Sequence, residues 1–116
     1  MISEGDVFVA HLPQADGGIK LRPVLLLREL PGFGDFLACG ISTQLHQQIV
    51  GCDLYLKEGT AEFAQSGLTA ASIVRLSFLS AVPVQRMARR LGRVSADCVA
   101  CLQRSLADRL TSDHKQ

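Results

Sequence analysis

The pattern of apolar and polar positions changes once along the chain. Before Pro83, short runs that are apolar, or that alternate with polar residues, are separated by turns rich in Gly and Pro. Runs of this kind are typical of β-strands. They predict strands at residues 6–12, 24–27, 35–41, 52–57 and 72–79. The second run is almost entirely apolar, so we expect that strand to be buried on both faces.

The last predicted strand places an arginine among apolar residues. Val74, Leu76 and Phe78 occupy alternate positions in it, and Arg75 lies between the first two. Successive side chains of a strand point to opposite faces of the sheet. Arg75 is therefore expected on the face opposite to these three residues.

After Pro83 the apolar spacing becomes helical. Apolar residues recur at i, i+3, i+4 and i+7, namely Val84, Met87, Ala88 and Leu91. This spacing predicts a short helix over residues 84–91. Ser95 is the expected N-cap of a terminal helix, whose apolar stripe is Val99, Leu102, Leu106 and Leu110. The polar residues 111–116 are expected to fray.

These elements together predict one domain over residues 1–116. Its class is α+β and mainly β: a small barrel-like sheet with a short helix and a C-terminal helix at its side or end. A chain of 116 residues with 47% hydrophobic and 20% charged residues can bury one modest core.

The charge is balanced overall but unevenly distributed. Twelve Lys and Arg against eleven Asp and Glu exclude a strongly basic, histone-like protein. An aromatic content of 5% with no Trp argues against a broad base-stacking platform. No acidic residue lies between Glu62 and Asp97, where the chain carries Arg75, Arg86, Arg89, Arg90 and Arg93. This segment presents either a solvated surface or a local basic face that contacts an anion.

The cysteines and the N-terminus bear on compartment and metal binding. The start MISEGD lacks the pattern of a signal peptide, and no apolar run is long enough to cross a membrane. We therefore expect a cytoplasmic protein with reduced thiols and no membrane association. Cys98 and Cys101 form one CxxC pair without a second pair or a nearby His. This favours packing on a helix face over a zinc site, and no metal is expected.

Six short segments occur in a recognisable order along residues 5–110. They are Gly5–Val7 (GDV), Lys20–Leu27 (KLRPVLLL), Gly40–Gln44 (GISTQ), Ser66–Leu68 (SGL), Ser72–Leu76 (SIVRL) and Arg90–Ser95 (RLGRVS). No single segment is decisive, but their order, spacing and the total length resemble the MazF/PemK family of toxin endoribonucleases.

The resemblance implies a fold, an activity and partners. The family fold is an SH3-like β-barrel with a C-terminal helix, usually in a homodimer. Its members cut single-stranded RNA at short sequence motifs without a metal or other cofactor, and a cognate antitoxin, a separate small chain, neutralises them. The expected products are a 2′,3′-cyclic phosphate and a 5′-hydroxyl. Other members of this architecture poison DNA gyrase.

The resemblance also implies site residues, position by position. Arg22 matches the catalytic arginine, Ser42 stands where active members usually have a threonine, Thr43 is the next hydroxyl, and Arg75 matches a second arginine. Lys20, Gln44, Ser77 and Asp16 are the expected RNA contacts. An arginine fork can bind two phosphate oxygens and stays charged, and a hydroxyl can orient the phosphate.

The general base is left open by the sequence. Many members carry Glu or His in the first loop, where this chain offers only Asp16, and Ser77 stands where some members have Asp. Asp16 and His11 are candidates, although each is as well explained as a turn residue and a packed or surface histidine. His46 and His114 are not expected to act in catalysis. Two alternatives follow: a non-catalytic toxin or nucleic-acid binder of the same fold, and a barrel that only binds a protein partner.

Overall fold

The structure is a computed structural model that describes residues 1–112. In chain order its elements are β1 (Asp6–Pro13), β2 (Ile19–Glu29), β3 (Phe36–Ser42), η1 (Leu45–Gln47), β4 (Leu54–Leu56), α1 (Ala61–Ser66), β5 (Ser72–Val82), η2 (Val84–Arg86), β6 (Met87–Arg93) and α2 (Ala96–Thr111). The two η elements are single 3₁₀ turns.

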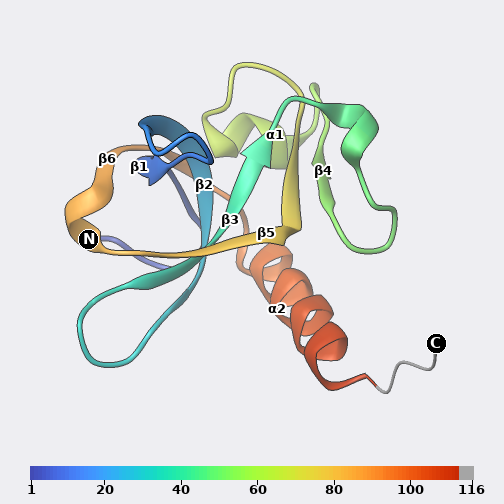
Figure 1. Ribbon diagram of the computed structural model, residues 1–116. Coiled ribbons are helices and arrows are strands. Elements are labelled where there is room, and N and C mark those ends of the chain that lie inside the picture. Colours follow the sequence, from blue (N-terminus) through green and yellow to red (C-terminus); the bar gives the residue numbers. More distant parts are fainter. Residues whose placement is uncertain (113–116) are drawn as a thin grey trace.

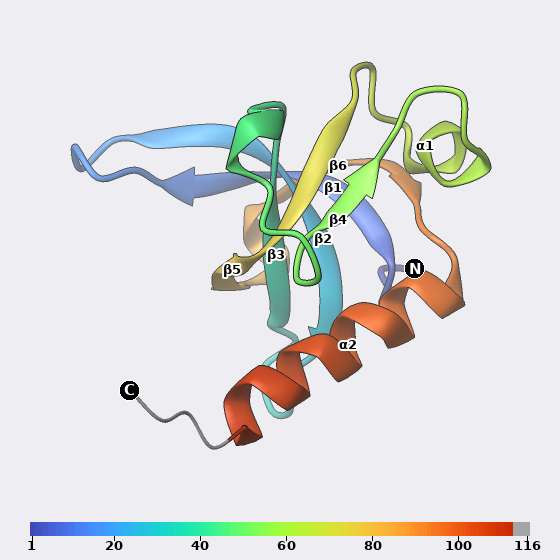
Figure 2. The same cartoon turned by 90° about the vertical axis from the view of Figure 1, so that its right-hand side faces the viewer.

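The strands form one antiparallel sheet in the order β4-β5-β3-β2-β1-β6. Figures 1 and 2 show that the sheet is strongly curved and that α2 lies across one side of it. The short helix α1 contacts β6. The architecture confirms the predicted mainly-β, SH3-like sheet with helices at its side.

Both faces of the central strands are buried. On one face, Leu25, Leu27, Cys39 and Val74 pack with Val99 and Leu102 of α2. On the other, a second cluster is built from Phe8, Ala10, Val24, Leu26, Phe36 and Val82. Alternate residues of the apolar run 24–27 thus belong to the two clusters. Each of these side chains is at most 1% exposed, so the strand is buried on both faces as its sequence predicts.

The helix predicted over residues 84–91 is wrong. Residues 84–86 form the η2 turn, and residues 87–93 form β6, which pairs with the open edge of β1. Two register shifts interrupt this pairing. Each irregularity inserts an extra residue into β6. The inward-facing residues are then no longer two positions apart, and their spacing resembles that of a helix. Met87 accordingly packs on one core cluster and Leu91 on the other.

The terminal helix is confirmed at its start. The Ser95 side chain accepts a hydrogen bond from the backbone N–H of Cys98 (3.2 Å), which makes it the N-cap. Val99 and Leu102 are buried, whereas Leu110 is 75% exposed. Thr111, predicted to fray, belongs to the last turn of α2, and residues 113–116 lie outside the described part of the chain. No helix within residues 1–112 is long and apolar enough to cross a membrane.

Glu62 of α1 joins the start of α2. Its carboxylate accepts hydrogen bonds from the backbone N–H (3.1 Å) and the hydroxyl (2.6 Å) of Ser95. These bonds favour the charged form, so the pKa of Glu62 lies below its ordinary value of 4.5. The bonds therefore stabilise the fold fully above that pH, and the contribution is lost as pH falls through the folded-state pKa.

We expect Glu62→Gln to lower the free energy of unfolding at neutral pH by about 1 kcal/mol, because the carboxylate is partly exposed. The difference from the parent should shrink in acid, below the ordinary carboxyl pKa of 4.5. Urea unfolding over a pH series measures both quantities. The exposed Glu58→Gln is the matched control, and a deficit that is constant with pH would contradict the assignment.

Candidate functional site

The sheet opens where β2 leaves β3. Pairing between these strands begins at Val24↔Gly40 and continues toward Glu29, whereas residues 19–23 of β2 pair with β1. Pro23, which has no N–H to donate to a ladder, stands at the point of separation. Figure 2 shows the resulting β1–β2 hairpin projecting beyond the sheet.

Two hollows meet at this opening. The first, here called the arginine cleft, has a volume of about 210 Å³ and is lined by Leu12, Gln14, Arg22, Pro23, Gly40, Ile41, Ser42, Arg75 and Phe78. The second, the apolar pocket, has a volume of about 350 Å³. Pro23, Ile41 and Ser42 line both.

The arginine cleft holds two guanidinium groups from strands on either side of β3. Arg22 comes from β2 and Arg75 from β5, where it pairs with Gly40. The Arg22 Nη2 donates to Oε1 of Gln14 (3.1 Å). The Gln14 Nε2 lies 3.3 Å from the carbonyls of both Leu12 and Pro13, so the β1 end orients the Arg22 side chain.

A buried donor of Arg75 has no partner in the described part of the chain. Its Nη1 donates to Oε1 of Gln47 (3.4 Å), but its Nε is buried and has no hydrogen-bond partner within residues 1–112. A buried donor without a partner costs about 1–3 kcal/mol. Such a group is stabilised when an anionic ligand accepts its hydrogen.

A bulge in β5 brings Phe78 into the same cleft. Cys39 pairs with Leu79 and the next residue, Gly40, pairs with Arg75, so residues 76–78 have no partner on β3. Oδ1 of Asp53 accepts a hydrogen bond from the backbone N–H of Leu76 (3.0 Å) within this bulge. The Phe78 ring consequently lies over Gly40, at a place that a Cβ atom would occupy.

The prediction that Phe78 shares a face with Val74 and Leu76 is therefore wrong. The ring lines the cleft and is 51% exposed. Strict alternation cannot reveal a bulge, and no residue in this segment marks one. The expectation for Arg75, opposite to Val74 and Leu76, agrees with their packing, because those two residues are in the core under α2.

The hydroxyl candidates lie at the end of β3. Ser42 lines both hollows, and its Oγ accepts a hydrogen bond from the backbone N–H of Gln44 (3.0 Å). Thr43 lines the apolar pocket only. The structure thus brings Arg22, Ser42 and Arg75 into one cleft and places Thr43 in the hollow beside it.

The four expected RNA contacts lie elsewhere. Lys20 is exposed near the start of β2, and Gln44 is exposed just after β3. Asp16 closes the turn of residues 14–18, because its Oδ1 accepts a hydrogen bond from the backbone N–H of Gly18 (2.8 Å). Ser77 lines a separate hollow against Leu106 and Arg109 of α2.

No carboxylate or imidazole lines the arginine cleft in the described part of the chain. Of the base candidates, Asp16 is in its turn, and His11 is an exposed residue of β1. His46 is exposed in η1, and His114 lies outside the described residues.

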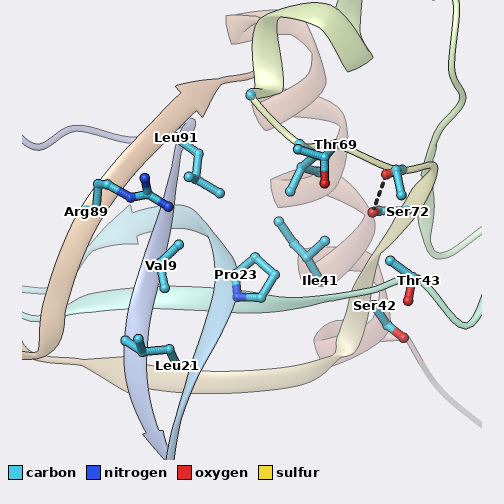
Figure 3. A pocket seen from close by; sticks show the side chains of 13 residues that line it. Val9, Leu21, Pro23, Ile41, Ser42, Thr43, Thr69, Ser72, Arg89 and Leu91 are labelled. Atoms are coloured by element: carbon cyan, nitrogen blue, oxygen red, sulfur yellow. Dashed lines mark hydrogen bonds between the residues drawn. The ribbon is translucent and has the colours of Figure 1, made fainter.

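The apolar pocket has walls from both halves of the sheet (Figure 3). Its apolar side chains are those of Val9, Leu21, Pro23, Ile41, Leu68, Ala70 and Leu91. Ser42, Thr43, Thr69 and Ser72 lie on one side, and Arg89 of β6 lies on the other. Arg89 belongs to the stretch without acidic residues between Glu62 and Asp97. It lines this pocket because residues 87–93 form strand β6 and not the helix that the sequence predicts.

The cysteines lie away from both hollows. All four are free. Burial raises the pKa of the Cys39 thiol to about 12 and also raises that of Cys98. Cys98 packs against the core, as predicted, whereas Cys101 is exposed. Within residues 1–112, no group of three His, Cys, Asp or Glu side chains is placed to hold a metal ion.

Comparisons with known proteins agree with this geometry. Among solved structures, the Mycobacterium tuberculosis toxin MazF-mt6 matches with a TM-score of 0.67 and 23% identity, over 94% of this chain and 99% of that one. An endoribonuclease in complex with its cognate antitoxin, from a mycobacterial species, matches with a TM-score of 0.69 and 15% identity, over 99% of this chain and 100% of that one. No curated protein matches the chain.

At these identities the solved structures establish the fold alone. A family model, described as a PemK-like, MazF-like toxin of type II toxin–antitoxin systems, matches residues 3–110. That range covers nearly the whole chain and includes every residue of the arginine cleft. The chain therefore belongs to the PemK-like, MazF-like family of toxins from type II toxin–antitoxin systems.

Proposed function

We propose that this toxin is a metal-independent endoribonuclease that cuts single-stranded RNA in the cytoplasm, with its reaction centre in the arginine cleft. The observation that carries the proposal is the convergence of Arg22, Arg75 and Ser42 from three neighbouring strands on one hollow. A diester phosphate entering the cleft meets two guanidinium groups and a hydroxyl.

The reaction is transesterification at phosphorus. The 2′-oxygen of the preceding ribose bonds to phosphorus, and the bond from phosphorus to the 5′-oxygen breaks. Arg22 and Arg75 hydrogen-bond the non-bridging oxygens and stabilise the additional negative charge of the phosphorane. Ser42 donates to the phosphate and fixes its orientation.

Proton transfer in this scheme involves solvent. The 2′-hydroxyl loses its proton to water or hydroxide, and the departing 5′-oxygen takes one from water. Arginine is a poor base because it so rarely deprotonates, so both guanidinium groups remain cations throughout. The products are a 2′,3′-cyclic phosphate and a 5′-hydroxyl.

The proposal extends to partners. One structural neighbour is in complex with its cognate antitoxin. We infer that an antitoxin with an acidic segment neutralises this chain by covering the cationic cleft, and that the toxin is a homodimer as in other members of its family. Charge complementarity with Arg22 and Arg75 supports the first of these inferences.

The purified protein is expected to cut long single-stranded RNA in the presence of EDTA, leaving cyclic-phosphate ends. Gel analysis of the fragments, with and without phosphatase and kinase treatment, identifies both ends. Arg104→Ala removes an exposed positive charge on α2, outside the arginine cleft, and it should cut like the parent. A folded protein that leaves several long RNAs intact would refute the proposal.

A non-catalytic toxin is the second candidate. The lack of any carboxylate or imidazole along the described walls of the arginine cleft favours it. Such a protein would bind RNA or inhibit gyrase without cutting RNA. The same assay separates the two candidates, because repeated turnover of RNA in EDTA excludes a pure binder.

A further inference from the structure

The apolar pocket is the second half of the opening that contains the arginine cleft. The two hollows share Pro23, Ile41 and Ser42. A nucleotide whose phosphate lies between Arg22 and Arg75 therefore has its neighbouring group at the mouth of the apolar pocket. What enters the pocket is decided by the chemistry of its walls.

The walls suit a base rather than a second phosphate. Seven apolar side chains line the pocket, from Val9 on β1 to Leu91 on β6. Phosphate loses its hydration in such surroundings, whereas the flat face of a base gains by leaving water. The volume of about 350 Å³ lies within the range of small-ligand sites.

Arg89 supplies the polar recognition group at one wall. Its neighbours Arg90 and Arg93 are tied to the buried carboxylate of Asp6, with Nε–Oδ1 distances of 3.3 and 4.0 Å. No hydrogen bond or ion pair joins the Arg89 guanidinium to another residue in the described part of the chain. Figure 3 shows this group reaching from β6 toward the apolar side chains of the pocket.

The fork geometry of a guanidinium selects among the bases. Guanine offers two adjacent acceptors, O6 and N7, on one edge. Adenine offers N7 beside an amino donor, cytosine offers an amino donor, and uracil offers a single O4 acceptor. At this edge only guanine accepts two parallel hydrogen bonds from one arginine, and this pairing is the commonest specific contact of arginine with a base. In single-stranded RNA, cytosine can also accept two, through N3 and O2 of its Watson–Crick edge, so cytosine is the competing base in the tests below.

We propose that the apolar pocket binds a guanine base of the RNA beside the scissile phosphate, and that Arg89 determines this specificity through O6 and N7. This inference rests on the proposed function, because it assigns the base that the same nuclease reads. The apolar walls hold the ring, Arg89 reads its edge, and the arginine cleft holds the adjoining phosphate.

The first test maps cleavage sites. A long RNA is cut by the parent, by Arg89→Gln and by Arg86→Gln, and the new ends are sequenced. The parent should cut with guanine at one fixed position next to the break. Arg89→Gln should cut these sites about 5- to 150-fold more slowly and lose the preference for guanine. Arg86 lies outside both hollows, so Arg86→Gln should retain parental rates and sites.

Atomic substitution in the substrate makes the test sharper. Replacing that guanosine with 7-deazaguanosine removes the N7 acceptor, and replacing it with inosine keeps both N7 and O6. The parent should cut the first substrate more slowly and the second at the normal rate. Arg89→Gln should cut the first no more slowly than the guanosine substrate. Equal rates of the parent on guanosine and 7-deazaguanosine would overturn the proposal.

A binding measurement separates this inference from the proposed function. Titration of the protein with 5′-GMP, 5′-AMP and 5′-CMP, followed by NMR, requires no cleavage. The parent should bind GMP about 5-fold or more tightly than AMP or CMP, and Arg89→Gln should bind all three alike. Loss of cleavage with this preference intact refutes only the nuclease. Equal affinities, or a preference that survives in Arg89→Gln, refute the guanine pocket.

Discussion

Replacing Arg22 with alanine should lower the rate of RNA cleavage by about 10³-fold and leave the protein folded. The residue is exposed, and its one hydrogen bond within residues 1–112 is to Gln14, so its removal leaves no buried group unsatisfied. Its effect falls on the phosphorane, whose charge would be held by Arg75 alone. Single-turnover cleavage in EDTA measures the loss, and urea unfolding should show a change within about 0.5 kcal/mol.

Two further variants test whether geometry or charge is responsible. Arg22→Lys keeps the charge but not the planar fork, so it should recover only part of the lost rate. Arg28→Ala removes an exposed arginine from the same strand, where it pairs with Glu4 at 3.5 Å, and should cut normally. Parental activity in a folded Arg22→Ala protein would exclude the arginine cleft as the reaction centre.

Replacing Gly92 with valine should destabilise the fold by about 3 kcal/mol or more. At Gly92 the backbone of β6 lies directly against the end of α1, and a Cβ atom would overlap the backbone of Gln65 and Ser66. Backbone cannot move aside as a side chain can, so α1 would have to separate from β6. Urea unfolding, followed by circular dichroism, gives the change in free energy.

Gly40→Ala is the matched comparison for Gly92→Ala, because Gly40 is also a strand glycine that faces a close neighbour. Its added methyl meets only the ring of Phe78, a half-exposed side chain that can turn away. Gly40→Ala should therefore destabilise the fold much less than Gly92→Ala. Equal losses in the two alanine variants would mean that the contact between α1 and β6 is not tight in solution.

Local patterns in the sequence were sufficient to predict several elements. The alternating and apolar runs predict β1, the buried part of β2, β3 and most of β5, and Ser95 marks the start of α2. Each of these rests on interactions between near neighbours in the chain or on burial that repeats regularly. The position of Arg75 follows from the same alternation.

Irregular pairing explains what the sequence alone could not predict. The shifts between β1 and β6 make residues 87–91 imitate a helical period, and the bulge of β5 moves Phe78 to the other face. Both irregularities depend on partner strands far away in the chain. Arg89 could not be identified as a pocket residue for this reason, whereas Arg22 and Ser42 could be named from the order of the family segments.

The separation of β2 from β3 gives the two arginines different mechanical supports. Arg75 lies on a strand that pairs with β3 and, one residue earlier at Val74, with β4. Arg22 lies on the part of β2 that pairs with β1 alone. A two-stranded ribbon is less stable than a strand with neighbours on both sides and opens at lower free energy. We therefore expect the Arg75 side of the cleft to be rigid and the Arg22 side to open more easily, with the change in flexibility between Pro23 and Val24.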